Sequence, residues 1–235
     1  MNWPQSFIKP KYLSLTYLLS LFLTLFFLSC EINYDGDERL LVTGRILNEN
    51  NLPIPNQDVE FWIYKGSGAG GDDDLISLTA TDNNGQFLML IPSPNNEDGF
   101  ELKISDPDTI YQHKILHRIL DKNFTNYEYN IGDIVLYQHH VITNAYITFN
   151  KTTVNTSLMD VKFKGDADYL VWINEPETYY GDYEPTLAHD YYKNVPLNST
   201  LTITYTIRDN STETLSTHEA TVTINNENLE YIINY

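Results

Sequence analysis

The amino-acid sequence predicts an all-β protein that folds as two tandem β-sandwiches behind an N-terminal export segment. Apolar and polar residues alternate over short runs, as in Val59-Glu60-Phe61-Trp62-Ile63, which is the period of a half-buried strand. Turn-forming clusters such as Asp82-Asn83-Asn84-Gly85 separate these runs at short intervals. No long stretch carries the period of an amphipathic helix. Together these observations favour antiparallel sandwiches.

Residues 1–29 predict a cleaved signal peptide. Lys9 and Lys11 precede an apolar run from Tyr12 to Leu28 that contains no charged residue. This order of basic, apolar and small residues is typical of a secretory signal. The alternative is an uncut membrane anchor, which needs about 20 predominantly apolar residues, and this run is shorter and contains several serines and threonines.

The end of this run, Phe27-Leu28-Ser29-Cys30, resembles the lipobox of bacterial lipoproteins. It departs from the commonest pattern because Phe27 and Leu28 stand where an aliphatic and then a small residue are usual. The resemblance implies that the signal is cut before Cys30, whose thiol and amine then receive lipid chains such as palmitate. It therefore implies a lipid-anchored protein of the outer membrane, because two or three acyl chains hold a protein stably on a bilayer.

Cysteine content and charge narrow the remaining possibilities. Cys30 is the only cysteine, so the exported chain folds without an internal disulfide. The formal net charge of −18 and the absence of a basic stripe exclude nucleic acid as a partner.

Residues 30–39 are predicted to form an acidic tether, because Glu31, Asp35, Asp37 and Glu38 lie close together with few apolar residues. This run resembles the acidic export signal of surface-exposed lipoproteins, which implies display at the cell surface. The alternative is a solvated spacer without an export role.

Residues 40–138 predict the first sandwich. Its predicted strands are Leu40–Ile46, Val59–Tyr64, Leu75–Ala80, Gln86–Ile91, Glu101–Ser105, Tyr111–Leu120 and Gly132–Tyr137. Predicted turns lie at residues 48–51, 82–85 and 92–96. In the second of these turns, Asp82 can accept backbone N–H groups while Gly85 supplies a positive φ.

Three motifs of this region follow one another in order: Val42-Thr43-Gly44-Arg45-Ile46, Leu52-Pro53-Ile54-Pro55-Asn56-Gln57-Asp58-Val59 and Thr81-Asp82-Asn83-Asn84-Gly85-Gln86-Phe87. They resemble the carboxypeptidase regulatory-like domain, which implies a transthyretin-like sandwich. Asn56 stands where that family prefers glycine, and asparagine tolerates the left-handed backbone that the turn requires.

Residues 139–235 predict a second sandwich, of the immunoglobulin- or fibronectin-like class. Alternation is clearest from Leu201 to Ile207, and shorter apolar pairs occur upstream and downstream. We expect the segment around Leu170 and Trp172 to be a strand of this sandwich, with Trp172 as its core aromatic residue.

No motif predicts an enzyme, and no cofactor is expected. The resemblance covers only the accessory sandwich of carboxypeptidases, and none of the six histidines has the glutamate three residues later that a zinc peptidase needs. His113 and His117 share one face of a predicted strand, but a zinc site needs a further ligand nearby.

Two segments are candidate ligand sites. Asp72, Asp73 and Asp74 follow the glycine-rich residues 66–71; this segment is either a solvated hairpin loop or a weak calcium site. The segment 174–192 holds the candidate ligand-binding residues Tyr179, Tyr180, Tyr183, Tyr191 and Tyr192, whose rings suit glycan or protein surfaces unless they only cover a sheet edge.

The sequence therefore predicts a non-enzymatic, outer-membrane or cell-surface lipoprotein that binds a glycan or protein ligand. Two alternatives remain: a fimbrial or pilus-like structural subunit whose C-terminal strand pairs with a neighbouring subunit, and an accessory lipoprotein of an outer-membrane nutrient importer.

Overall fold

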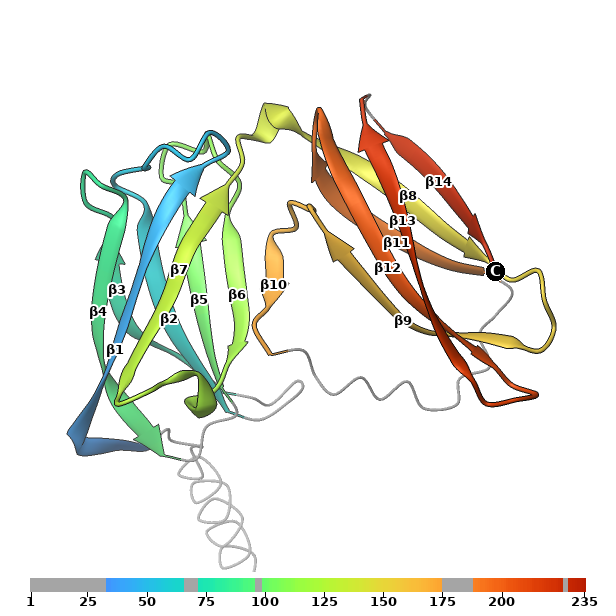
Figure 1. Cartoon of the computed structure of the whole chain (residues 1–235). Coiled ribbons are helices and arrows are strands. Elements are labelled where there is room, and N and C mark those ends of the chain that lie inside the picture. Colours follow the sequence, from blue (N-terminus) through green and yellow to red (C-terminus); the bar gives the residue numbers. More distant parts are fainter. Residues whose placement is uncertain (1–32, 66–71, 96–98, 175–187, 226–227) are drawn as a thin grey trace, which may run out of the picture.

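The computed structural model describes residues 33–65, 72–95, 99–174, 188–225 and 228–235, and these form two β-sandwiches (Figure 1). The predicted all-β class is confirmed, since the described residues contain only strands and two 3-10 turns, η1 (Asp121–Asn123) and η2 (His139–Val141). No helix within these ranges is long and apolar enough to cross a membrane.

The first sandwich packs a three-stranded sheet, in the order β4-β1-β7, against a five-stranded sheet, in the order β10-β6-β5-β2-β3. Its strands are β1 (Asn33–Asn48), β2 (Asp58–Lys65), β3 (Asp72–Ala80), β4 (Gln86–Asn95), β5 (Gly99–Ser105), β6 (Lys114–Ile119), β7 (Glu128–Leu136) and β10 (Leu170–Trp172). All seven strands predicted between residues 40 and 138 are present, and their alternating apolar residues fill one core between the two sheets.

The second sandwich packs a sheet in the order β11-β8-β14 against a sheet in the order β13-β12-β9. Its strands are β8 (Ile142–Asn150), β9 (Thr156–Lys164), β11 (Ala188–Pro196), β12 (Ser199–Asp209), β13 (Leu215–Ile224) and β14 (Leu229–Asn234). Phe149 is fully buried at the centre of its core and contacts the rings of Tyr191 and Tyr205.

The predicted chemistry of the turn at residues 82–85 is confirmed. Asp82 Oδ1 accepts the N–H groups of Asn84 and Gln86, both at 2.8 Å, and Gly85 has φ +72°. A Cβ at Gly85 would lie 2.3 Å from the carbonyl oxygen of Ile46, so the turn has no room for a side chain there. Asn56 has φ +59°, the left-handed geometry expected of it.

Two predictions for the edge of the first sandwich are wrong. Residues 33–39 belong to β1 and so are not a solvated tether, and residues 92–95 continue β4 and so are not a turn. The two extensions pair with each other, with Tyr34 opposite Pro94 and Arg39 opposite Pro92. The acidic residues of this segment lie in an irregular stretch of β1 between two positions that pair with β4, and local composition does not reveal this pairing.

The assignment of residues 170–172 to the second sandwich is also wrong. β10 pairs in parallel with β6 of the first sandwich, with Leu170 opposite Ile115 and Trp172 opposite His117. Figure 1 shows β10 beside β6, away from the sheets of the second sandwich. Trp172 is therefore not a core residue: 43% of its surface is exposed.

Candidate functional site

Four residues singled out by the sequence lie outside the described ranges. They are Cys30, Tyr179, Tyr180 and Tyr183. The glycine-rich residues 66–71 also lie outside them.

The three consecutive aspartates begin β3 instead of forming a loop. Asp72, Asp73 and Asp74 stand opposite Lys65, Tyr64 and Ile63 of β2. Because successive strand residues point to opposite faces, the carboxylates of Asp73 and Asp74 do not converge as a calcium site requires. Within the described residues, no three His, Cys, Asp or Glu side chains are grouped to hold a metal ion.

Asp74 instead accepts a hydrogen bond from the hydroxyl of Tyr34, at 2.6 Å. Burial and this carboxylate both raise the pKa of Tyr34. The contact joins the start of β1 to the start of β3.

Tyr191 and Tyr192 occupy adjacent positions on β11 and face opposite sides of its sheet. Tyr191 packs between the rings of Phe149 and Phe163, at centroid distances of 5.7 and 5.3 Å, and is part of the core. Tyr192 is 53% exposed and makes an edge contact with the equally exposed Tyr146 on β8. Of this described pair, only Tyr192 presents its ring to solvent.

A group of outward-facing aromatic residues lies on the five-stranded sheet of the first sandwich. Phe61, Ile63, Phe100 and Leu102 are fully buried, so the residues that alternate with them point outward. We call this outer surface the aromatic face. It comprises Glu60, Trp62, Tyr64, Leu75, Leu78, Glu101, Lys103, Ile115, His117, Leu170 and Trp172.

Strand register places these side chains in two rows across the sheet. One row runs through Leu75, Trp62 and Glu101 and continues, through the side-chain contact of Glu101 with His117, to Trp172. The next row runs through Leu78, Glu60, Lys103, Ile115 and Leu170. The two tryptophans lie on β2 and β10, three strand spacings apart, which is about 14 Å at the usual spacing of roughly 4.8 Å.

Polar neighbours hold Trp62 in place. Its indole Nε1–H donates to Glu60 Oε2 at 2.7 Å, and the Lys103 ammonium lies 4.3 Å from the ring centroid. Lys103 is also paired with Glu101, at 3.2 Å between Nζ and Oε2. This chain of contacts fixes the ring before any ligand arrives.

A second chain of contacts reaches Trp172. The ring of His117 stacks on Tyr64 at a centroid distance of 5.1 Å and meets the ring of Trp172 edge-on at 4.3 Å. His117 Nδ1 lies 2.5 Å from Glu101 Oε1, which joins this group to the Lys103 group. His113 instead contacts Tyr169, so the two histidines do not meet.

The aromatic face is built by both halves of the chain. Backbone hydrogen bonds hold β10 on β6: Ile115 N–H donates to the Tyr169 carbonyl at 2.6 Å, and Ile173 N–H donates to the His117 carbonyl at 2.9 Å. Just beyond β10, the amide of Asn174 donates to the Arg118 carbonyl. We call residues 165–174, which pass from the second sandwich to the first, the crossing segment.

Charged residues fasten the crossing segment at its start. Lys193 Nζ on β11 lies 2.5 Å from Asp168 Oδ2 and 3.3 Å from Asp166 Oδ2. Burial raises the pKa of Asp166, and burial lowers the pKa of the neighbouring Lys114 on β6. From the first sandwich, the Gln112 amide donates to the carbonyl of Ala167 at 2.8 Å.

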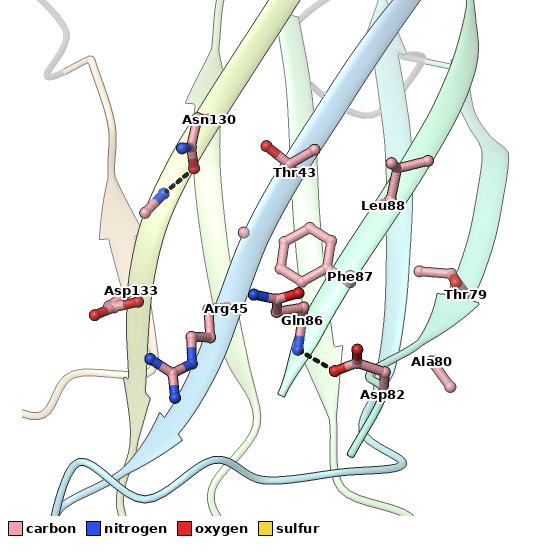
Figure 2. Close-up of a pocket in the computed structure, with 12 residues that line it drawn as sticks. Thr43, Arg45, Thr79, Ala80, Asp82, Gln86, Phe87, Leu88, Asn130 and Asp133 are labelled. Atoms are coloured by element: carbon pink, nitrogen blue, oxygen red, sulfur yellow. Dashed lines mark hydrogen bonds between the residues drawn. The ribbon is translucent and has the colours of Figure 1, made fainter. Parts of the chain in front are cut away.

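A shallow pocket of about 670 Å³ lies over the other sheet, along β1, β4 and β7 (Figure 2). Its charged lining residues are Arg45, Asp82 and Asp133. Arg45 Nε already donates to the Asn84 carbonyl, and one guanidinium among two carboxylates does not favour an anion. The pocket contains no outward-facing aromatic ring comparable to those of the aromatic face.

No protein-family model matches the chain, and no curated protein matches it. A variant of the shaft pilin SpaA from Lactobacillus rhamnosus GG is 12% identical over 84% of this chain and 98% of the pilin, with a TM-score of 0.32. A 9R-lipoxygenase from Cyanothece PCC8801 is 21% identical over 50% of this chain, with a TM-score of 0.30.

A 3-chlorocatechol 1,2-dioxygenase from Rhodococcus opacus 1CP is 11% identical over 45% of this chain, with a TM-score of 0.30. The chain spans 20% of the lipoxygenase and 63% of the dioxygenase. Similarities at this level bear on neither the function nor the partners of this protein.

Sequence reasoning missed the aromatic face, although part of its signal was present. Trp62 and Tyr64 alternate with buried residues on β2, which marks them as outward-facing, and Glu101 and Lys103 do the same on β5. The contribution of Trp172 had no local signal, because it depends on pairing between strands far apart in the chain.

Proposed function

We propose that this protein is a non-enzymatic, lipid-anchored binding protein whose aromatic face binds a neutral glycan. The observation that carries the proposal is the row of Trp62, Glu101, His117 and Trp172, in which two indoles flank two hydrogen-bonding side chains.

Ring geometry and polarity suit sugars. An indole face offers a flat apolar surface to the C–H groups of a pyranose ring, and carboxylate and imidazole groups form hydrogen bonds with hydroxyls. The distance between Trp62 and Trp172 matches a short oligosaccharide lying across the strands. Lys103 already positions the ring of Trp62, and Tyr64 positions the ring of His117. Little side-chain entropy is therefore lost when a ligand binds.

Charge selects among ligand classes. The chain carries −18 overall, and the aromatic face adds two glutamates against one lysine. Polyanionic glycans are therefore repelled, and neutral polysaccharides are the better match.

The lipobox-like Cys30 supports placement at the outer membrane, at the cell surface if the acidic residues after it act as an export signal. Only Glu31 and Ile32 separate Cys30 from the first residue of β1, so the first sandwich follows the lipid directly. In this arrangement the sandwich nearest the lipid carries the proposed binding surface.

The binding proposal is tested with the chain from Glu31 to Tyr235 on a panel of neutral and anionic polysaccharides, by affinity electrophoresis and calorimetry. We expect binding to at least one neutral glycan, with affinity reduced tenfold or more in Trp172→Ala, about 1.4 kcal/mol or more. Tyr192→Ala is the matched control, since its ring is exposed on the other sandwich. Absence of neutral-glycan binding, or equal affinities of wild type and Trp172→Ala, would contradict the proposal.

Lipidation is tested separately, by labelling cells with a fatty-acid analogue. We expect the wild-type protein to incorporate label and fractionate with the outer membrane, and Cys30→Ala to do neither. A labelled Cys30→Ala protein would remove the lipid anchor from the proposal and leave the glycan site untouched.

One observation favours a second candidate function, the fimbrial or pilus-like subunit. β14 is an edge strand in the order β11-β8-β14, so within the described residues one side of its backbone is unpaired with any strand. An edge of this kind accepts a strand from another chain. High-mass ladders in unboiled electrophoresis would support assembly, and a monomeric profile in detergent would contradict it.

A further inference from the structure

In each sandwich the first strand pairs in parallel with a later strand of the same sheet. In the first sandwich β1 pairs with β7, with Leu41 opposite Glu128 and Asn48 opposite Leu136. In the second sandwich β8 pairs with β14, with Ala145 opposite Leu229 and Asn150 opposite Asn234. The chain therefore enters each parallel pair at one end and leaves it at the other end, and it returns to the first sandwich once more, as β10.

This arrangement decides how a pulling force acts on the hydrogen bonds. When two parallel strands are pulled from opposite ends, they must slide past each other, and all hydrogen bonds between them carry the load together. In an antiparallel hairpin such as β12–β13, pulling at the open end, where Ser199 stands opposite Ile224, loads one pair at a time. Because its hydrogen bonds break one after another, the hairpin opens at a much lower force than a parallel pair with a similar number of bonds.

The first strand of each sandwich, β1 or β8, is also paired on both sides. β1 lies between β4 and β7, and β8 lies between β11 and β14. The backbone of Leu40–Arg45 pairs with β4 while the backbone of Leu41–Asn48 pairs with β7. A pull along β1 must break both ladders before the strand leaves the sheet.

The direction of such a pull follows from the layout of the chain. Figure 1 shows β1 beginning at one end of the first sandwich, whereas η2, which leads to β8, lies at the opposite end. The crossing segment adds a second connection between the sandwiches, through β10 on β6 and through Lys193 with Asp168.

We propose that both sandwiches act as shear clamps, so that the protein carries tension between its N-terminal side and its second sandwich. This function goes beyond ligand binding and holds whichever ligand the aromatic face takes. It suits a chain held at its N-terminal side while its other parts are attached to a large, immobile partner.

Single-molecule force spectroscopy tests the proposal on the chain from Glu31 to Tyr235. Because Cys30 is the only cysteine of the sequence, this chain accepts defined thiol handles. The shear geometry uses a cysteine added before Glu31 and another added after Tyr235. The peeling geometry uses Thr200→Cys with Asn225→Cys, two exposed positions at the open end of the β12–β13 hairpin.

At equal loading rates, we expect the first rupture in the shear geometry to need severalfold more force than the first rupture in the peeling geometry. Equal urea midpoints for the two handle variants would show that neither pair of cysteines has changed the fold. Rupture in the shear geometry at a force equal to or below that of the peeling geometry would overturn the proposal. Neither result depends on glycan binding, so the two proposals fail independently.

Discussion

The two sandwiches reach the same architecture from different kinds of residue. The first has the larger aliphatic core, with turns closed by Asp82 and Asp106. The second has a smaller core in which Phe149 contacts the rings of Tyr191, Tyr205 and Tyr235. Along the chain β10 lies between β9 and β11 of the second sandwich, but it pairs with β6 in the sheet of the first.

This difference shows which parts of the chain build the aromatic face, the proposed binding surface. The first sandwich supplies a rigid sheet with Trp62, Glu101 and His117 on its outer side, and the second supplies Trp172. The pairing of β10 with β6 covers the edge of β6 and also completes the aromatic face. The crossing segment therefore links the stability of the first sandwich to the shape of the proposed binding surface.

Removing one core phenylalanine from each sandwich is expected to have the largest effect. Phe61→Ala should destabilise the first sandwich by about 3–5 kcal/mol, because a fully buried ring that packs on Phe100 leaves a cavity. Phe149→Ala should destabilise the second by a similar amount. Urea unfolding followed by hydrogen exchange should assign each loss to its own sandwich; equal losses throughout the molecule in both variants would mean that the sandwiches unfold as one unit.

Lys193→Met should lower the free energy of unfolding by about 1–3 kcal/mol, because Asp166 and Asp168 lose their cation. This loss lies between those typical of exposed and of buried ion pairs. Burial alone would lower the pKa of Lys193, but the hydrogen bond and charge of Asp168 raise it. A raised folded-state pKa contributes stability below the usual value of about 10.4 and loses it as the pH rises further.

Urea midpoints at neutral pH and above pH 10.4 measure this effect. The wild-type midpoint should fall more than that of Lys193→Met at alkaline pH. Lys162→Met removes an exposed pair with Asp160 and should change stability little at either pH. Equal alkaline losses in wild type and Lys193→Met would contradict a role for this cation at the junction.

Asp106→Ala should destabilise the first sandwich by about 1 kcal/mol. The carboxylate accepts the N–H groups of Ile110 and Tyr111 at 2.7 and 2.8 Å and the amide of Gln57 at 3.2 Å. Burial opposes ionisation, but these donors outweigh it and lower the pKa of Asp106.

The sign of the pH dependence follows from that lowering. The contribution of Asp106 is present above the usual carboxyl pKa, about 3.9, and is lost as the pH falls through the lower folded-state value. The stability difference between wild type and Asp106→Ala, measured by thermal unfolding, should shrink below pH 4. Asp108→Ala, at an exposed neighbouring position, is the control; a difference that grows in acid would contradict the assignment.

Local patterns predicted most of the fold. The alternation in Val59–Tyr64 and Gln86–Ile91 marked strands whose inward residues are buried, and the Asp82 turn formed as its residues required. These features depend on residues within a few positions of one another, which is why the sequence is sufficient to find them.

The errors all concern pairing between distant segments. Asn33–Arg39 is acidic and resembles a tether, yet it extends β1 because β4 lies alongside. Trp172 resembles a core residue, yet it is exposed because Leu170 and Val171 pair with β6. The ligand-binding hypothesis named Tyr191, which packs against the core, and overlooked Trp62, although its alternation with the buried Phe61 and Ile63 marks it as outward-facing.

Hydrogen exchange at the amides of Ile115 and Ile173 tests most directly whether the second half of the chain completes the sheet of the first. These N–H groups donate to Tyr169 and His117 across the β6–β10 pair. We predict that both amides are protected nearly as well as that of Leu102 on the central strand β5, and that the Ile115 amide loses this protection when residues 166–173 are replaced by a glycine-serine linker. Exchange at the rate of an exposed loop in the wild-type protein would contradict the composite aromatic face and the binding site proposed on it.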